Sequence, residues 1–164
     1  MPTWTNEEIS FHDDQRLMGK LIERIGVFNG LSQQELIELL RNAEKCNFSS
    51  GETIVRQNGT GAYLYIIIAG QVLVLKSSEN RGGKILAKLH TGDCFGEMSF
   101  IDGDPRSASV IADSPCILLR LNENACLSAP LAGAKIFRNI ARILSCRLRA
   151  MDEAYVTQSS SGAA

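Results

Sequence analysis

Between Cys46 and Leu121 short runs of β-branched residues alternate with turns rich in glycine and aspartate. Turn signals at intervals of about ten residues are typical of an antiparallel sandwich or barrel. A polar loop, SSENRGG, is expected to form an exposed hairpin tip. The sequence therefore predicts a mainly β domain with strands at residues 53–56, 63–68, 71–76, 84–89, 107–112 and 116–121.

Helical patterns flank this β region on both sides. From Leu17 to Phe28 apolar residues recur at helical spacing, and Gly30 supplies a stop. Ser32 and Glu35 then form a capping-box pattern, which predicts a second helix running to about Ala43. Two helices are therefore expected before the first strand.

The pattern returns to helix after Asn122. The segment ENACLS predicts one short turn of helix ended by Pro130, and a long amphipathic helix is expected from Gly133 to about Tyr155. Its apolar face is broad enough to cover the mouth of a barrel and also to meet a second copy of the same helix, although packing on its own domain explains each residue equally well. That face consists of Ile136, Phe137, Ile140, Leu144, Leu148, Met151 and Tyr155.

Length and charge limit the organisation of the chain and its partners. At 164 residues it is the size of one domain, which we expect to span residues 17–155 between polar tails at 1–16 and 156–164. With 17 basic and 18 acidic residues, the net charge of −1 gives no general attraction to nucleic acid.

The apolar runs and the cysteines of the sequence indicate in which cellular compartment the protein is expected. The longest apolar run, Tyr63 to Ala69, is far below the roughly 20 residues that span a bilayer, and the N-terminal sequence has no signal-peptide pattern. Five cysteines without paired spacing fit free thiols rather than a disulfide framework or a zinc site. We therefore expect a cytoplasmic protein with neither a DNA partner nor a membrane partner.

The stretch FGEMSFIDGDPRSAS, residues 95–109, is the strongest candidate for a binding site. A helical turn starting at Gly96 would offer unpaired backbone amides to an anion. Arg106 could neutralise a phosphate through two parallel hydrogen bonds, and Ser107 adds a hydroxyl. A carboxylate beside a phosphate needs a donor, and a sugar hydroxyl would be such a donor for Glu97. Together these groups would form a nucleotide-binding site, although the same residues also fit an ordinary turn with a solvated arginine.

The wider stretch GDCFGEMSFIDGDPRSASV resembles the phosphate-binding cassette of the cyclic nucleotide-binding domain family. The resemblance also covers GETIVRQNG, LYIIIAGQVLVL and the helical flanks, or roughly residues 17 to 155. It implies a jelly-roll β-barrel with N-terminal helices, a short helix between two strands and a long C-terminal lid helix.

The resemblance also implies a role for each matching residue. Glu97 would bind the ribose 2′-hydroxyl and Arg106 the cyclic phosphate, with amides of the cassette completing the phosphate cradle. Apolar residues of two strands would wall the pocket, although barrel core explains each of them on its own. The implied set is Gly96, Glu97, Met98, Ser99, Arg106, Ser107, Ala108, Val74, Leu86, Ala87 and Leu89. On the long helix, matching positions place Met151 and Asp152 opposite the base, with Arg147 one turn earlier. For Asp152 the usual exposure of such residues favours an ordinary solvent-facing aspartate.

Two departures from the family pattern affect these expectations. Many relatives have Gly-Asp before the LYII-type strand, but this chain has Gly61 and Ala62, so an acidic partner of the cassette arginine is missing. We therefore expect Arg106 to be held less firmly or by other groups. Ser107 follows the arginine, and serine there allows either an adenine or a guanine base.

No motif of a catalytic nucleophile or a P-loop is present, so we expect binding rather than turnover. Neither His12 nor His90 has a second histidine at a metal spacing, so no metal or cofactor is expected. Cys94 is expected to be a buried, inert thiol, with a redox role as the alternative. The ligand implied is cyclic AMP, with cyclic GMP as second candidate.

Only nine residues follow Tyr155, too few for a helix-turn-helix. The first hypothesis is therefore a stand-alone receptor whose C-terminal helix closes over the ligand and alters a partner or homodimer surface at residues 133–155. The alternatives are an interaction or dimerisation module with an unused pocket, and a truncated transcription regulator.

Overall fold

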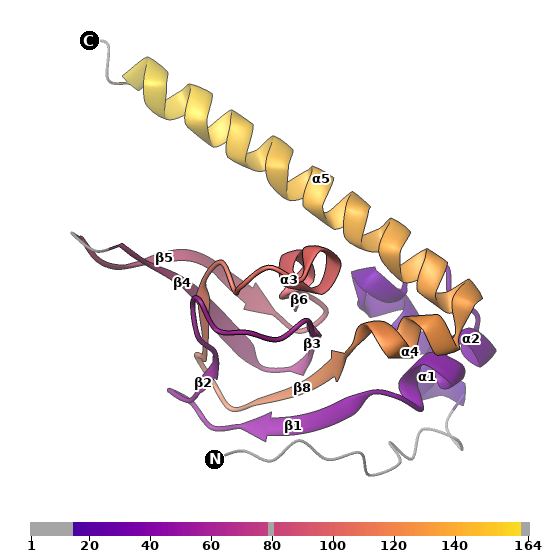
Figure 1. Cartoon of the computed structure of the whole chain (residues 1–164). Coiled ribbons are helices and arrows are strands. Elements are labelled where there is room, and N and C mark those ends of the chain that lie inside the picture. Colours follow the sequence, from indigo (N-terminus) through magenta and orange to yellow (C-terminus); the bar gives the residue numbers. More distant parts are fainter. Residues whose placement is uncertain (1–14, 79–80, 162–164) are drawn as a thin grey trace.

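Two four-stranded antiparallel sheets form the body of the protein in a computed structural model that describes residues 15–78 and 81–161. The strand orders are β1-β8-β3-β6 and β2-β7-β4-β5 (Figure 1). Apolar side chains from both sheets pack together between them in one cluster. The strands are β1 (Glu44–Phe48), β2 (Thr53–Val55), β3 (Leu64–Ala69), β4 (Gln71–Ser78), β5 (Arg81–His90), β6 (Cys94–Phe95), β7 (Ser109–Ala112) and β8 (Cys116–Leu121).

The expected mainly β fold with flanking helices is confirmed, with differences at particular strands. The sequence did not predict β1 or β6, because β1 buries only two of its five residues and β6 is two residues long. β7 begins two residues later than expected, at Ser109. β4 and β5 extend into SSENRGG, so the expected polar loop is largely strand.

Helices gather at one end of the sheets (Figure 1). Helix α1 (Gln15–Arg24) ends earlier than expected, and Gly26–Phe28 form a separate 3₁₀ turn, η1. Helix α2 (Gln33–Leu40) begins with the predicted capping box, in which the Ser32 hydroxyl accepts from the Glu35 amide at 3.2 Å and the Ser32 amide donates to the Glu35 carboxylate at 2.6 Å. The expected tail at 1–16 lies outside the described residues except for its last two, which belong to α1.

Pro130 begins a helix instead of ending one. Helix α4 (Glu123–Ser128) stops two residues before it, and α5 (Pro130–Ser161) starts at the proline. Proline suits the first helical position, because its fixed φ matches the helix and the N–H it lacks would have no partner there. α5 also continues beyond Tyr155, so residues 156–161, expected as a polar tail, are helical.

Only the first part of α5 is packed into the domain. Ile136 and Ile140 are fully buried in a second apolar cluster, formed with α1, η1, α2 and α4. The side-chain amide of buried Asn139 donates to the carbonyls of Val27 at 2.9 Å and Asn29 at 2.7 Å. Beyond this anchor the helix projects past the sheets (Figure 1). No helix in the described residues is both long and apolar enough to cross a membrane.

Candidate functional site

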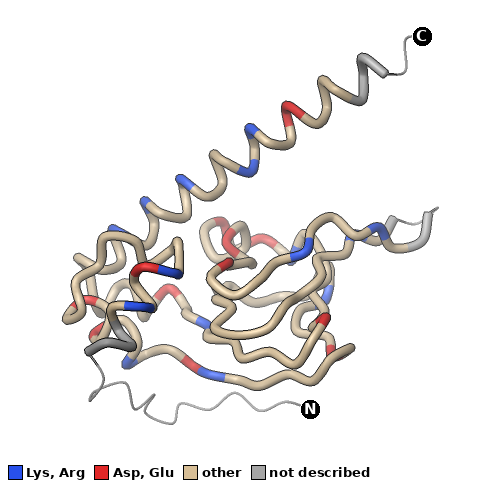
Figure 2. Tube along the Cα trace, turned by 180° about the vertical axis from the view of Figure 1, so that it is seen from behind, with Lys and Arg blue, Asp and Glu red and all other residues tan. Residues whose placement is uncertain are grey.

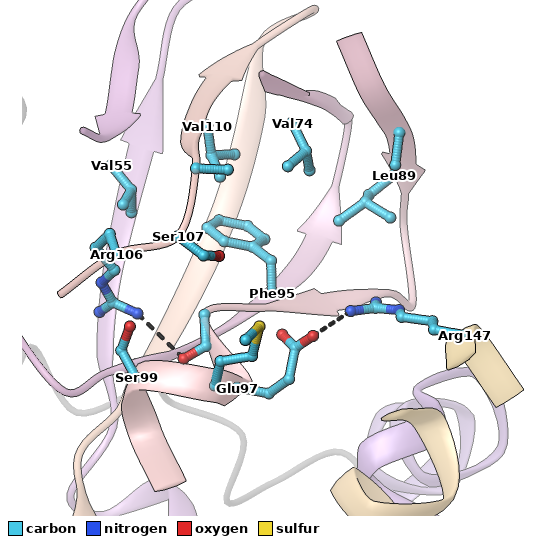
Figure 3. A pocket seen from close by; sticks show the side chains of 14 residues that line it. Val55, Val74, Leu89, Phe95, Glu97, Ser99, Arg106, Ser107, Val110 and Arg147 are labelled. Atoms are coloured by element: carbon cyan, nitrogen blue, oxygen red, sulfur yellow. Dashed lines mark hydrogen bonds and ion pairs between the residues drawn. The ribbon is translucent and has the colours of Figure 1, made fainter. Parts of the chain in front are cut away.

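A pocket of about 160 Å³ lies between the sheet of β2, β7, β4 and β5, helix α3 (Glu97–Asp102) and α5. Apolar side chains form one wall, and the glutamate and arginines face them (Figure 3). Most of the cassette residues singled out in the sequence therefore meet at one place. The lining residues are Val55, Val74, Ala87, Leu89, Phe95, Gly96, Glu97, Met98, Ser99, Arg106, Ser107, Ala108, Val110 and Arg147.

Gly96 starts the short helix α3 in a conformation that requires glycine. Its φ is +79°, a region that residues with a Cβ rarely adopt. A Cβ added there would lie 2.6 Å from Arg106 Nη1 and 2.7 Å from the Tyr63 carbonyl oxygen. The glycine thus lets the cassette arginine pack directly against the backbone, in addition to leaving the first amides of α3 open.

Arg106 is built into the wall of the barrel. The residue is only 4% exposed, and its Nη1 donates to the carbonyls of Tyr63 at 3.0 Å and Gly96 at 3.1 Å. The Tyr65 ring centre lies 5.3 Å from its guanidinium carbon, which adds a cation–π contact. Burial lowers the pKa of the guanidinium below its ordinary value. Two backbone carbonyls thus hold Arg106, so of the two expectations, a less firmly held arginine or one held by other groups, the structure agrees with the second.

Glu97 and Arg147 form an ion pair across the pocket (Figure 3). Glu97 is 6% exposed, and its Oε1 accepts from Arg147 Nη1. Arg147 Nη2 also donates to the Cys94 carbonyl at 2.7 Å. The sequence suggested Arg147 as a contact to the base, but the structure directs it onto the carboxylate expected to bind the sugar. The pairing could not be read from the sequence, because fifty residues separate the partners.

The apolar wall differs from the expected set at one residue. Val74, Ala87 and Leu89 line the pocket as expected, but Leu86 does not and is 55% exposed. Val74 pairs with Ala87 and Leu75 with Ile85, so Leu86 is an extra residue in β5 at a β-bulge. The sequence gives no direct sign of such a bulge, which is why this prediction was wrong.

The sequence also missed three apolar lining residues, Val55, Phe95 and Val110. Val55 and Val110 lie in predicted strands, where strict alternation would have been the signal to find them. Phe95 lies in β6, a strand that the sequence did not predict. The stacked rings of Tyr65 and Phe95, with centroids 4.9 Å apart, extend this wall toward Arg106.

Comparison with known proteins agrees with this geometry. The family model described as the cyclic nucleotide-binding domain matches residues 45–129, more than half of the chain. The chain belongs to this family. The fold is accordingly the jelly-roll barrel of cyclic nucleotide-binding domains, with N-terminal helices and a long C-terminal helix.

Individual relatives and structures place the chain within the family. The cyclic AMP receptor protein of Thermus thermophilus is 31% identical over 126 residues, which cover 77% of this chain and 58% of that protein. The regulatory subunit of cAMP-dependent protein kinase from Dictyostelium discoideum is 30% identical over 110 residues, 64% of this chain and 34% of that protein. The chain thus spans less than two thirds of the length of either relative.

A solved cyclic nucleotide-binding domain from Methylobacillus flagellatus superimposes with a TM-score of 0.75 at 26% identity, covering 86% of this chain and 85% of that one. Here the likeness extends over nearly the whole length of both chains. The fold described above is therefore shared beyond the cassette.

Met151 and Asp152, expected opposite the base, do not line the pocket of this cyclic nucleotide-binding domain. Met151 is 69% exposed, and Asp152 is also exposed. α5 runs onward from its anchor and projects past the barrel, so only the long side chain of Arg147 reaches into the pocket (Figures 1 and 3). The exposure of Asp152 agrees with the solvent-facing alternative, whereas a contact of Met151 with the base stays a prediction. A sequence match fixes positions along a helix but not the direction in which the helix leaves the domain.

Cys94 sits beside the cassette as a buried thiol. Burial, with a contribution from the nearby Glu97 charge, raises its pKa to about 12. A thiol reacts as its thiolate, so this environment favours the inert role over the redox role. All five cysteines are free in the structure.

Proposed function

We propose that the chain binds a cyclic nucleotide in this pocket and that it prefers cyclic AMP to cyclic GMP. The observation that carries the proposal is the buried Arg106, held by backbone carbonyls beside the first amides of α3. Only Nη1 donates to those carbonyls, and an arginine has five N–H donors, so donors remain for a cyclic phosphate. Charge-assisted pairs of this kind are the strong class of hydrogen bonds.

The remaining groups supply the contacts to the sugar and the base. A ribose hydroxyl donates to Glu97, and the apolar wall from β4 and β5 covers the ring systems. Ser107 is compatible with either adenine or guanine as the base. The preference for cyclic AMP rests on the names of the two relatives described above, each of which refers to cyclic AMP.

The output of binding is a change in the position of α5. Arg147 donates to the Glu97 carboxylate in the structure, so a sugar hydroxyl that binds Glu97 must share or replace that contact. The ligand shifts α5 by as much as its affinities for the two arrangements differ. The protein acts as a cytoplasmic receptor, with no catalytic step, and its signal passes to a protein partner rather than to DNA or a membrane.

Calorimetric titration with cyclic AMP, cyclic GMP and 5′-AMP tests this function. Micromolar or tighter binding of cyclic AMP is expected, with cyclic GMP weaker. Much weaker binding of 5′-AMP is also expected, because it lacks the ring phosphate for which the cradle is shaped. Absence of heat and of any thermal shift with both cyclic nucleotides would show that the pocket is not a receptor site.

A second candidate function is dimerisation through the far part of α5. Four large apolar side chains are exposed there, and Leu148 and Tyr155 lie seven residues apart on one face. Sedimentation equilibrium of the whole chain tests this function, with Leu148→Glu as the variant and Arg149→Glu as the control at an adjacent exposed residue. A dimer lost in the first variant and kept in the second is expected, whereas a monomer at all concentrations excludes it.

A further inference from the structure

A second and larger cavity, of about 430 Å³, lies on the other side of Arg147. It is enclosed by the end of α1 and η1, the turn between β5 and β6, and the middle of α5. Among the described residues, Arg147 is the one side chain that lines both this cleft and the pocket. The cleft is nevertheless separate, because none of the residues 95–109 that line the pocket contributes to it.

Positive charge dominates the cleft. Arg24 and Arg142 line it, both are exposed, and neither has an ion-pair or hydrogen-bond partner for its side chain among the described residues. Asp93 is the one carboxylate in its lining, and Asp93 Oδ2 accepts from the His90 amide at 2.8 Å. This is a local excess of guanidinium groups in a chain whose net charge is −1. Figure 2 shows that the basic residues of α5 lie nearer to the start of the helix and that its acidic residues lie farther toward the C-terminus.

The walls of the cleft are fixed by close packing. Gly92 in the β5–β6 turn has a φ of +96°, and a Cβ there would lie 2.6 Å from the Arg24 carbonyl oxygen. The turn is therefore pressed against the end of α1. On the opposite wall, the amide of Asn139 holds η1 and the residue after it onto α5. The two elements that carry Arg24 and Arg142 are thus held at a set separation by contacts within the chain.

We propose that this cleft is an anion site for a small molecule bearing at least two phosphate groups. Arg24 and Arg142 bind the phosphates from opposite walls, and Arg147 closes the inner end. Guanidinium groups pair with phosphate oxygens through parallel hydrogen bonds. Two arginines on separate rigid elements match a ligand with two charged groups better than a single anion. The inference does not depend on nucleotide binding in the pocket.

Titration of the whole chain with pyrophosphate at constant ionic strength tests the site, with inorganic phosphate as the single-group comparison. Pyrophosphate is expected to bind at least ~10-fold more tightly than phosphate, because it engages both arginines. Arg24→Gln and Arg142→Gln are each expected to weaken pyrophosphate binding by ~5-fold or more. Arg149→Gln, at an exposed arginine of the same helix outside the cleft, is expected to leave it unchanged. Thermal melts of the three variants check that they are folded.

Arg106→Leu separates this site from the pocket. Pyrophosphate binding that survives Arg106→Leu but falls in Arg142→Gln supports the cleft, whether or not cyclic nucleotides bind. Loss of pyrophosphate binding in Arg106→Leu alone would assign the anion to the pocket and overturn the proposal. The proposal would also be overturned if Arg149→Gln weakened pyrophosphate binding as much as Arg142→Gln. The same holds if phosphate and pyrophosphate bound with equal affinity, or if neither bound.

Discussion

The pocket has two sides that are built in different ways. On the barrel side Arg106 is almost fully buried and is held by two backbone carbonyls and an aromatic ring. On the helix side, the Arg147 side chain is 36% exposed and reaches Glu97 from a helix whose residues 148–157 are all exposed. Both sides place an arginine at the same pocket, but only one is fixed by the sheet.

This difference assigns separate tasks to the two sides. The two carbonyls that hold Arg106 belong to Tyr63, directly before β3, and to Gly96, directly after β6. These two strands pair with each other, so we expect the barrel side to keep its geometry when a ligand binds. The contact between Glu97 and Arg147 involves one flexible side chain at a partly exposed position, and such contacts contribute little to stability. We therefore expect affinity to depend on the barrel side and response to depend on the helix side.

The largest contrast is expected in thiol reactivity. Cys94 has a pKa of about 12 and is buried, whereas Cys146 is exposed on α5. At pH 8 iodoacetamide should modify Cys146 on the order of a thousandfold faster than Cys94, since only a thiolate attacks. Peptide mass spectrometry over time measures both rates, and all five cysteines should react in denaturant. Similar rates in the native protein would mean that the barrel side opens readily.

The next effect concerns the two glycines at the ends of α3. Gly96→Ala should lower the free energy of unfolding by about 3 kcal/mol, because strain at positive φ adds to a close contact with Arg106 and Tyr63. Gly103 has a similar φ of +74° but nothing within 4 Å, so Gly103→Ala should cost only about 1 kcal/mol. Urea denaturation measures both. Equal costs would contradict the close approach of Arg106 to the backbone.

Arg106→Leu should weaken cyclic AMP binding by about 2 kcal/mol or more, roughly 30-fold, the scale for losing a charged hydrogen-bond donor. Calorimetry measures the change, and circular dichroism should show an intact fold. Arg106→Lys keeps the charge but not the planar fork, so it should give an intermediate loss. If the leucine variant bound cyclic AMP as tightly as the parent, Arg106 would not be part of the binding site.

Arg147→Gln should have the smallest effect on stability. Arg147 is partly exposed although Glu97 is buried, and the glutamine amide can still donate to the carboxylate, so the free energy of unfolding should fall by only about 1 kcal/mol. Urea denaturation measures this change, and Arg149→Gln on the same helix is the control variant. A loss as large as that of Gly96→Ala would show that the helix side is fixed as firmly as the barrel side.

Local residue chemistry explains the elements that sequence reasoning found. The capping box at Ser32 and Glu35 and the glycine at the start of α3 act within a few residues of themselves, and both form as expected. The end of α1 and the role of Pro130 were wrong, because several backbone conformations suit those residues and packing chooses among them. Leu86 was misplaced for a related reason, since a bulge depends on the partner strand.

The sequence by itself determined the β domain, its helical flanks and the cassette with Gly96, Glu97 and Arg106, because turns, caps and strand alternation are local properties. Only the tertiary structure decided that carbonyls support Arg106, that Arg147 reaches Glu97, and that Arg24 and Arg142 face one cleft. Most of these residues lie far apart in the sequence, and the positions of Arg142 and Arg147 follow from how α5 is anchored by Ile136, Asn139 and Ile140. No local pattern encodes the direction in which that helix leaves the barrel.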